Sequence, residues 1–138
     1  MVFTEAELAY LDKQPLGRLA TQREDGTLQV SPVGFSVHPE DGTIDIGGYS
    51  MARSQKYHNV AANGRVAFVV DDVPSLDPWR VRCLEIRGVG QVIPGPKANE
   101  GDLDGAIIRI TPRRIISYGI EVPDQAVHQL TPNNRDVG

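Results

Sequence analysis

The stretch VRCLEIRGVGQVI, residues 81–93, is a long strand-like segment with two glycines, Gly88 and Gly90, near its middle. A glycine inside a strand has no side chain to pack, and it is typical of a bend, a bulge or a close approach by another backbone. Strands of a closed barrel bend at such points. We therefore predict one long barrel strand over residues 81–93, bent at its glycines.

Further strand-like segments lie on both sides of this one. Residues 65–70, RVAFVV, are apolar on both faces, which predicts a strand covered on one side by the core and on the other by a helix or a second subunit. Residues 27–37 alternate in polarity but contain Pro32, which marks a sheet edge, a bulge or a site where a ligand approaches the backbone. Strands are also expected at residues 106–111 and 114–118. Many short strands and few helices predict a mainly β chain that forms a small barrel.

The length of 138 residues fits one domain around one hydrophobic core. We expect residues 1–138 to form it, with a polar tail from about residue 123. Residues 94–105 are polar and rich in glycine and proline, which predicts a mobile connecting loop. Thr4 and Glu7 have the spacing of a helix capping box, so a short helix is expected before the first strand.

The composition is that of a globular protein, with 40% hydrophobic and 23% charged residues. The net charge of −4 disfavours a general nucleic-acid binder, because the phosphate backbone rewards a basic surface. The single cysteine, Cys83, cannot form an internal disulfide, which fits a reducing compartment. The first residues lack the blocks of a signal peptide, and no apolar run approaches ~18 residues. A cytoplasmic protein without membrane or nucleic-acid partners is predicted.

Residues 50–63 are expected to form a helix between two strands, with Ser50 as its N-cap. Arg53 and Lys56 then lie three residues apart near its start. The first turn of a helix has unpaired N–H groups and the positive end of the helix dipole, so cations there are unfavourable unless an anion binds among them. Together with the hydroxyls of Ser50 and Ser54, these cations predict a phosphate site. The alternative is a helix end whose cations face water.

Residues 71–80 are expected to form a loop that contains Trp79 and Arg80. An aromatic side chain in a loop either anchors local packing or contacts a ligand or partner, and both interpretations stay open here. Glu85 and Arg87 alternate on one face of a strand, so they are interpreted as a surface or interface ion pair rather than as an acid–base dyad.

No residue stands out as a catalytic acid, base, nucleophile or metal ligand. The three histidines are far apart in sequence, and none has a partner at metal-ligand spacing. The chain lacks a Walker loop, a Rossmann glycine pattern and a Gly-x-Ser-x-Gly elbow. A phosphate site in a small barrel therefore predicts a protein that holds a phosphorylated cofactor, which brings its own chemistry.

At this point the residues resemble a known family, the pyridoxamine-phosphate-oxidase-like split β-barrels, over about residues 8–118. The resemblance rests on Ser31-Pro32-Val33, on the block with Ser54, Lys56 and Asn59, and on residues 65–72 and 85–90. It implies a homodimer of six-stranded split barrels with a cofactor groove between the subunits. In that fold Arg53, Ser54 and Lys56 would hold the phosphate, in agreement with the site predicted above from the start of the helix, which also includes Ser50.

By the same resemblance, Pro32 and Val33 would lie along the flavin-type ring and Ser31 would join them in the cofactor site. Trp79 and Arg80 would reach the site of the partner subunit. These residues complete the predicted cofactor-binding set, and no catalytic or metal-binding residue is assigned.

The cofactor and the reaction are expected from the branch of the family that the chain resembles. True pyridoxamine phosphate oxidases have further basic substrate residues and a Trp-containing C-terminal segment, whereas this chain has Ile115-Ile116-Ser117-Tyr118-Gly119 and a polar tail. The resemblance is to the branch that uses coenzyme F420, a 5-deazaflavin. The expected function is an F420H2-dependent reductase that transfers hydride to an unsaturated small organic substrate. The alternatives are an FMN-binding oxidoreductase of the same fold and a non-enzymatic binder of a cofactor or a haem-type ligand.

Overall fold

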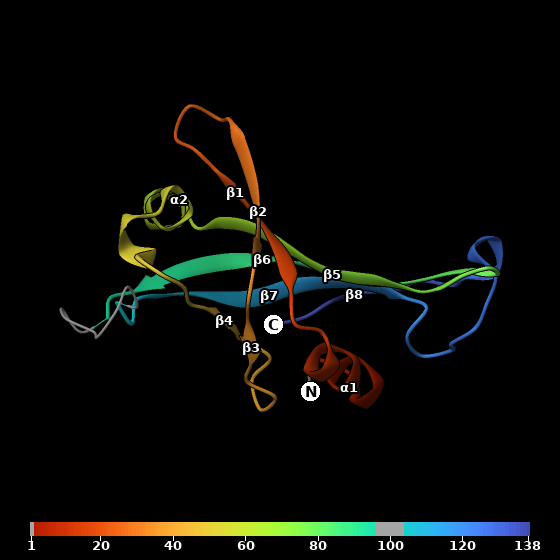
Figure 1. Cartoon of the computed structure of the whole chain (residues 1–138). Helices are drawn as coiled ribbons and strands as arrows, with labels where there is room; N and C mark the ends of the chain where they lie inside the picture. The colour runs from red at the N-terminus through yellow and green to blue at the C-terminus, as the bar shows by residue number, and fades with distance from the viewer. Residues whose placement is uncertain (1, 96–103) are drawn as a thin grey trace.

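A computed structural model describes residues 2–95 and 104–138. It shows one antiparallel sheet of eight strands, in the order β2-β1-β5-β6-β7-β4-β3, with β8 paired to β7. The sheet is curled into a half-barrel, with α2 near one end of the long strands and α1 beside the sheet (Figure 1). Most of the connector predicted at residues 94–105 lies outside the described residues. The elements are α1 (Glu5–Lys13), β1 (Gly17–Gln22), β2 (Leu28–Val33), β3 (Ser36–Val37), β4 (Ile44–Ile46), the 3-10 turn η1 (Met51–Arg53), α2 (Gln55–Asn63), β5 (Arg65–Leu76), β6 (Trp79–Ile93), β7 (Ile107–Tyr118), the 3-10 turn η2 (Val127–Gln129) and β8 (Asn133–Asp136).

The predicted split-barrel architecture is confirmed. The eight strands comprise the six of the expected core and two short additions, β3 and β8. Alternate residues of the central strands point to a common inner face, where they form one hydrophobic core with Met51 and Val60 from the helical segments. On β5, Val66, Phe68 and Val70 are buried, while Ala67 and Val69 are only half-buried. The outer face of this apolar strand is thus partly uncovered within a single chain.

The long strand predicted at residues 81–93 is confirmed as β6, and it pairs along its length with β7. A register shift falls between Arg87 and Gly88. A Cβ atom on Gly88 would lie 2.3 Å from the carbonyl oxygen of Thr111, and one on Gly90 would lie 2.8 Å from Cγ1 of Val66. Both glycines therefore allow close packing at the bend. The two strands predicted at residues 106–111 and 114–118 are in fact one strand, β7, because the register shift accommodates Pro112 without ending the ladder.

The prediction of a loop at residues 71–80 is wrong. β5 and β6 continue as a hairpin through this segment, with Ser75 opposite Arg80 and Leu76 opposite Trp79, and they turn at Asp77 and Pro78. An irregularity between Asp72 and Ser75 takes up the proline-containing stretch. The ladder is reinforced where Arg82 donates to the carboxylate of Asp72 from the neighbouring strand.

The N-terminal helix is held by the C-terminal strand. The predicted capping box is confirmed: Thr4 Oγ1 accepts from the Glu7 amide, and Glu7 Oε1 accepts from the Thr4 amide at 2.9 Å. The Glu7 side chain is fully buried, where it accepts hydrogen bonds from Ser117 at 2.6 Å and from Arg135 of β8. The polar tail predicted from residue 123 therefore includes a strand that completes the environment of α1.

Candidate functional site

The helix predicted at residues 50–63 is two helical segments, and Ser50 precedes the first of them rather than capping the α-helix. Ser50 is in the left-handed region with φ 48°, and only the short turn η1 follows it. The backbone of Ser54 is extended, and its hydroxyl accepts from the Tyr57 amide, so Ser54 is the N-cap of α2. The extended backbone of Ser54 separates η1 from α2 and so prevents one continuous helix. Arg53 consequently ends η1, while Lys56 is in the first turn of α2.

Both predicted phosphate-binding cations are free of ion pairs within residues 2–95 and 104–138. Arg53 is exposed, and Lys56 is half-buried one helical turn before the buried Val60. The first turn of α2 contains no acidic residue to balance them. This end of α2 therefore combines helix N–H groups with two uncompensated positive charges, a combination that favours an anion.

The two serines of the predicted phosphate site differ in availability. Ser54 Oγ donates to the Met51 carbonyl at 2.7 Å and caps α2, so its hydroxyl has intramolecular partners. Ser50 is exposed and makes no capping hydrogen bond with its side chain. Asp104 accepts from the Ala52 amide at 2.9 Å and so satisfies one donor of η1. The anion-binding potential is therefore concentrated at the start of α2 rather than at η1.

The predicted ring-binding segment lies on β2, at one edge of the sheet. Ser31 and Val33 point to the inner face, whereas Pro32 is exposed on the outer face. Pro32 on an edge strand fits the rule that proline cannot donate to a ladder. Ser31 Oγ is a buried side-chain oxygen that has no hydrogen-bond partner among the described residues. Such orphaned polar atoms are uncommon in folded proteins and call for a partner that the isolated chain does not supply.

Trp79 and Arg80 are not near the other predicted residues within one chain. The twelve residues of β5 separate the end of α2 from the tip of the β5–β6 hairpin, which corresponds to roughly 36 Å of strand. Helix α2 and the hairpin tip lie at opposite ends of the sheet (Figure 1). Trp79 is 51% exposed. Arg80 Nε donates to Asp124 at 3.1 Å and lines a hollow of about 240 Å³ between the hairpin and the C-terminal segment.

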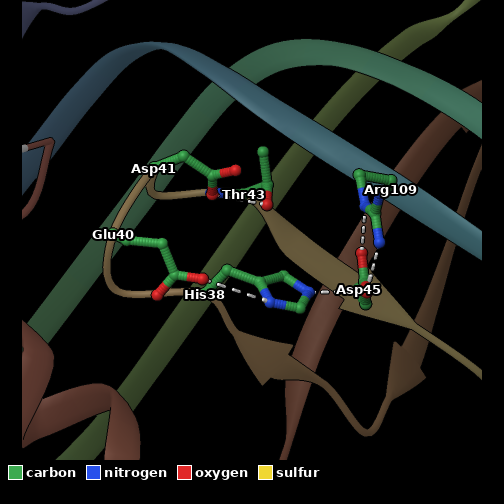
Figure 2. Close-up of polar contacts among 6 residues, drawn as sticks. All are labelled: His38, Glu40, Asp41, Thr43, Asp45 and Arg109. Carbon is green, nitrogen blue, oxygen red and sulfur yellow. Dashed lines mark hydrogen bonds and ion pairs between the residues drawn. The ribbon is translucent and has the colours of Figure 1, made fainter.

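A second polar cluster, which the sequence did not single out, lies at β3, β4 and β7. Figure 2 shows Asp45 between His38 and Arg109. Arg109 donates two hydrogen bonds to the Asp45 carboxylate at 2.8 and 3.0 Å, and a ring nitrogen of His38 lies 2.7 Å from Asp45 Oδ2. The Arg109 hydrogen bonds hold the pKa of Asp45 below its usual value, although partial burial opposes them. The hydrogen bond to Asp45 raises the pKa of His38.

This cluster could have been found from the pattern of the strands. Asp45 stands between Ile44 and Ile46, and Arg109 stands between Ile108 and Ile110, and all four isoleucines are buried. Asp45 and Arg109 are in register across β4 and β7, so their side chains meet on the outer face. Asp45 is thus paired with Arg109 across the two strands, and we interpret the arrangement as a structural brace.

A groove of about 520 Å³ lies between α1 and β3. Leu8 and Leu11 line it from the helix, and Phe35 and Val37 line it from the segment that follows the predicted ring-binding residues.

Within the described ranges, no group of three or more histidine, cysteine, aspartate or glutamate side chains could hold a metal ion. Nor does any described helix combine the length and apolarity needed to span a membrane.

Comparison with known proteins decides the family. Residues 3–133 match the family described as pyridoxamine 5'-phosphate oxidase. The chain belongs to this family. A 5a,11a-dehydrotetracycline/5a,11a-dehydrooxytetracycline reductase from Streptomyces rimosus is 48% identical over 122 residues, which cover 88% of this chain and 86% of the relative. The resemblance seen in the sequence is thereby confirmed at the level of the family.

Solved structures of the pyridoxamine 5'-phosphate oxidase fold agree. A structure described as an F420 reductase is 30% identical, with a TM-score of 0.57, and the match covers 75% of this chain and 90% of that one. A conserved hypothetical protein from Mycobacterium tuberculosis is 24% identical, with a TM-score of 0.66 and coverage of 92% and 93%, and this likeness shows the fold alone. The chain is an oxidoreductase of the pyridoxamine 5'-phosphate oxidase family.

Proposed function

We propose that this protein is an F420H2-dependent reductase of an unsaturated organic substrate. The observation that carries the proposal is the start of α2, where Arg53 and Lys56 have no ion-pair partner within the described parts of the chain, next to helix N–H groups that favour a phosphate. Two relatives support it, because one is named as a reductase of dehydrotetracyclines and another as an F420 reductase.

The residues fit a phosphorylated deazaflavin. Lys56 and Arg53 neutralise the phosphate, with Ser50 available as a further hydrogen-bonding group. Ser31 Oγ has no hydrogen-bond partner among the described residues, and the polar edge of a bound ring would supply one. Pro32 and Val33 place edge-strand backbone beside that ring.

When bound, a reduced deazaflavin supplies a hydride to an electron-poor carbon of the substrate. The chain contributes orientation and the exclusion of water rather than an acid or base. The proton that completes reduction of the double bond comes from solvent. A reaction of this kind requires no catalytic acid or base from the chain.

We also propose that the functional unit is a homodimer. On the outer face of the sheet, Val30, Ala20 and Ala67 lie in one row across β2, β1 and β5. Leu28 is 76% exposed and Val30 is 68% exposed, which leaves apolar side chains in water at a sheet edge. In this dimer we propose that the hairpin with Trp79 and Arg80 reaches the cofactor site of the other subunit. Light scattering should report a dimer, and Val30→Glu should shift it to monomer; a wild-type monomer would end this part of the proposal.

We place the substrate in the groove between α1 and β3. This groove directly follows Val33 along the chain, and its volume of about 520 Å³ is within the range typical of small-molecule sites, roughly 300–1,000 Å³. Ala9 is exposed on the α1 side of the groove. Ala9→Trp should raise the KM for substrate without changing cofactor affinity, whereas Glu5→Trp on the exposed start of α1 should change neither.

The deciding experiment is a parallel fluorescence titration with F420 and FMN, followed by turnover of 5a,11a-dehydrotetracycline with reduced F420. Lys56→Ala should weaken F420 binding by about 1.5–3 kcal/mol, the range for a hydrogen bond to a charged group. Lys13→Ala, which removes an exposed lysine from α1, is the matched control and should have no effect. Binding of FMN alone would instead support an FMN oxidoreductase. Tight F420 binding without turnover of any unsaturated substrate would support a non-enzymatic carrier.

A further inference from the structure

The buried polar side chain on α2, Asn59, is 2% exposed and has every polar group of its amide engaged. Its Nδ2 donates to Thr21 Oγ1 at 3.0 Å and to Gln29 Oε1 at 3.4 Å. Its Oδ1 accepts from Gln55 Nε2 at 2.7 Å. A buried amide that reaches two strands at once can hold a helix in one position relative to both.

The network continues to the surface. Gln55 Oε1 accepts from Arg23 Nη2 at 3.0 Å, so an unbroken series of donors and acceptors runs from the β1–β2 turn through α2 to β2. Gln55 is also the first residue of α2, directly after the N-cap. The network therefore fixes the start of α2 as well as its middle.

Two segments of this network, on α2 and on β2, adjoin the two parts of the proposed cofactor site. Lys56 lies between Gln55 and Asn59 on α2. On β2, Gln29 is two residues before Ser31, and both side chains point to the inner face because residues two apart in a strand share a face. The network thus joins the segment proposed to hold the phosphate to the segment proposed to hold the ring.

We propose that Asn59 is a positioning residue that sets the spacing between the phosphate-binding start of α2 and the ring-binding segment of β2. This inference rests on the proposed function, since it needs a cofactor that bridges the two segments. A ligand that contacts both segments gains most when their spacing is fixed before it binds. A fragment that contacts one segment gains nothing from that spacing.

The test compares a two-part ligand with its fragment. F420 and its phosphate-free deazariboflavin fragment are titrated against the wild type, Asn59→Ala and Gln29→Met. Asn59→Ala should raise the Kd of F420 roughly 10-fold, because the spacing of the two segments is then no longer fixed before the ligand binds. The Kd of the fragment should change less than about 2-fold. Gln29→Met removes only the link to β2 and leaves the bond to Thr21, so it should fold normally and raise the Kd of F420 by a smaller factor.

Asn63 provides the matched control. It lies one helical turn after Asn59, and its Nδ2 donates to the carbonyl of Gln22 on β1 at 2.7 Å, but it makes no bond to β2. Asn63→Ala should leave the ratio of the two Kd values unchanged. Amide hydrogen exchange of residues 28–33 in the ligand-free protein should be faster in Asn59→Ala and Gln29→Met than in Asn63→Ala.

The outcomes separate this inference from the proposed function. If the wild type binds FMN and not F420, the F420 assignment falls, and FMN with riboflavin replaces the ligand pair for the same comparison. Equal weakening of ligand and fragment would mean that Asn59 only stabilises the fold, and would overturn the inference while F420 dependence stands. Unchanged affinities with unchanged hydrogen exchange would overturn it as well. A wild type that binds no ligand of either pair overturns both.

Discussion

Two groups of charges, one around Asp45 and one at the start of α2, differ in how they are balanced. At β4 and β7, the Asp45 carboxylate accepts two hydrogen bonds from the Arg109 guanidinium and lies 2.7 Å from a ring nitrogen of His38. Eight residues after Asp45, Arg53 and then Lys56 have no anionic partner within the described residues. Matched charges hold neighbouring strands together, whereas we propose that the unmatched cations bind an anionic ligand.

The comparison distinguishes stability from affinity. Removing one member of a matched group leaves the other charge without its counter-charge and hydrogen bonds. The free energy of unfolding should therefore fall. Removing an unmatched cation should leave folding unaffected and weaken ligand binding. Variants of each kind therefore test this distinction.

The largest effect is expected at the most deeply buried matched pair, Glu7 and Arg135. Arg135→Ala leaves a fully buried carboxylate with one fewer compensating cation, and should destabilise the protein by about 3 kcal/mol. Urea denaturation at pH 7 measures the change. Arg114→Ala removes an exposed ion pair from the same β7–β8 ladder and should cost less than about 1 kcal/mol. Equal losses of unfolding free energy in the two variants would contradict the prediction that a buried ion pair contributes more to stability than an exposed one.

The same pair predicts a pH dependence. Burial raises the pKa of Glu7, but hydrogen bonds from Arg135, Ser117 and the Thr4 amide outweigh it, so the folded pKa is below the usual 4.5. The stabilisation is therefore fully present above the unfolded pKa and is lost as pH falls through the folded pKa. Melting temperature measured from pH 7 to pH 3 should fall less steeply in Glu7→Gln than in the wild type.

A smaller loss is expected at the brace on β4. Asp45→Asn removes the charge that accepts two hydrogen bonds from Arg109, and should destabilise the protein by about 1–2 kcal/mol. The affinity for F420 should not change. Asp71→Asn, which affects an exposed pair with Arg18, serves as the control. A large loss of cofactor affinity in Asp45→Asn would show that the brace belongs to the binding site.

The pKa of the His38 imidazole should report on its contact with Asp45, although that contact contributes little to stability. Asp45 raises its pKa, with Asp41 acting in the same direction and Arg109 against it. A raised folded pKa means that the contribution is present below the unfolded value of 6.5 and is lost as pH rises through the folded pKa. An NMR titration of the imidazole should show this raised pKa, and Asp45→Asn should bring it down. An unchanged titration in that variant would argue against the contact.

The smallest effect on stability is expected at the unmatched cations. Lys56→Ala and Arg53→Ala should alter the free energy of unfolding by no more than about 0.5 kcal/mol, as is usual for surface changes away from specific contacts. Thermal melting in the absence of ligand measures this. In the presence of saturating F420 the same variants should melt below the wild type, because ligand stabilisation follows affinity. A clear loss of stability without ligand would place these cations among the matched charges.

Much of the fold followed from local patterns. The glycines at positions 88 and 90 predicted the bend of β6, and Thr4 with Glu7 predicted the start of α1. These signals are local in sequence, so the chain itself displays them. The errors came where distant partners decide the outcome. Pairing with β6 keeps β7 continuous past Pro112, and the ladder carries the hairpin through residues predicted as a loop.

Sequence patterns indicate only part of the candidate site. They suggest which residues form the proposed phosphate site, but not the left-handed backbone of Ser50, because the residue type serine does not indicate a positive φ. The inward direction of Ser31 and the outward direction of Pro32 depend on the register with β1. The network around Asn59 joins residues up to 38 positions apart, and no local pattern marks such contacts.

The contact between Glu7 and Arg135 also affects how the chain reaches its native state. The two residues are 128 positions apart, and a growing chain emerges from the ribosome with its N-terminus first. Until Arg135 has been synthesised, the carboxylate of Glu7 is better hydrated than buried. The docking of α1 should therefore be among the last folding events, and a nascent chain stalled before residue 135 should leave its first helix open to proteases.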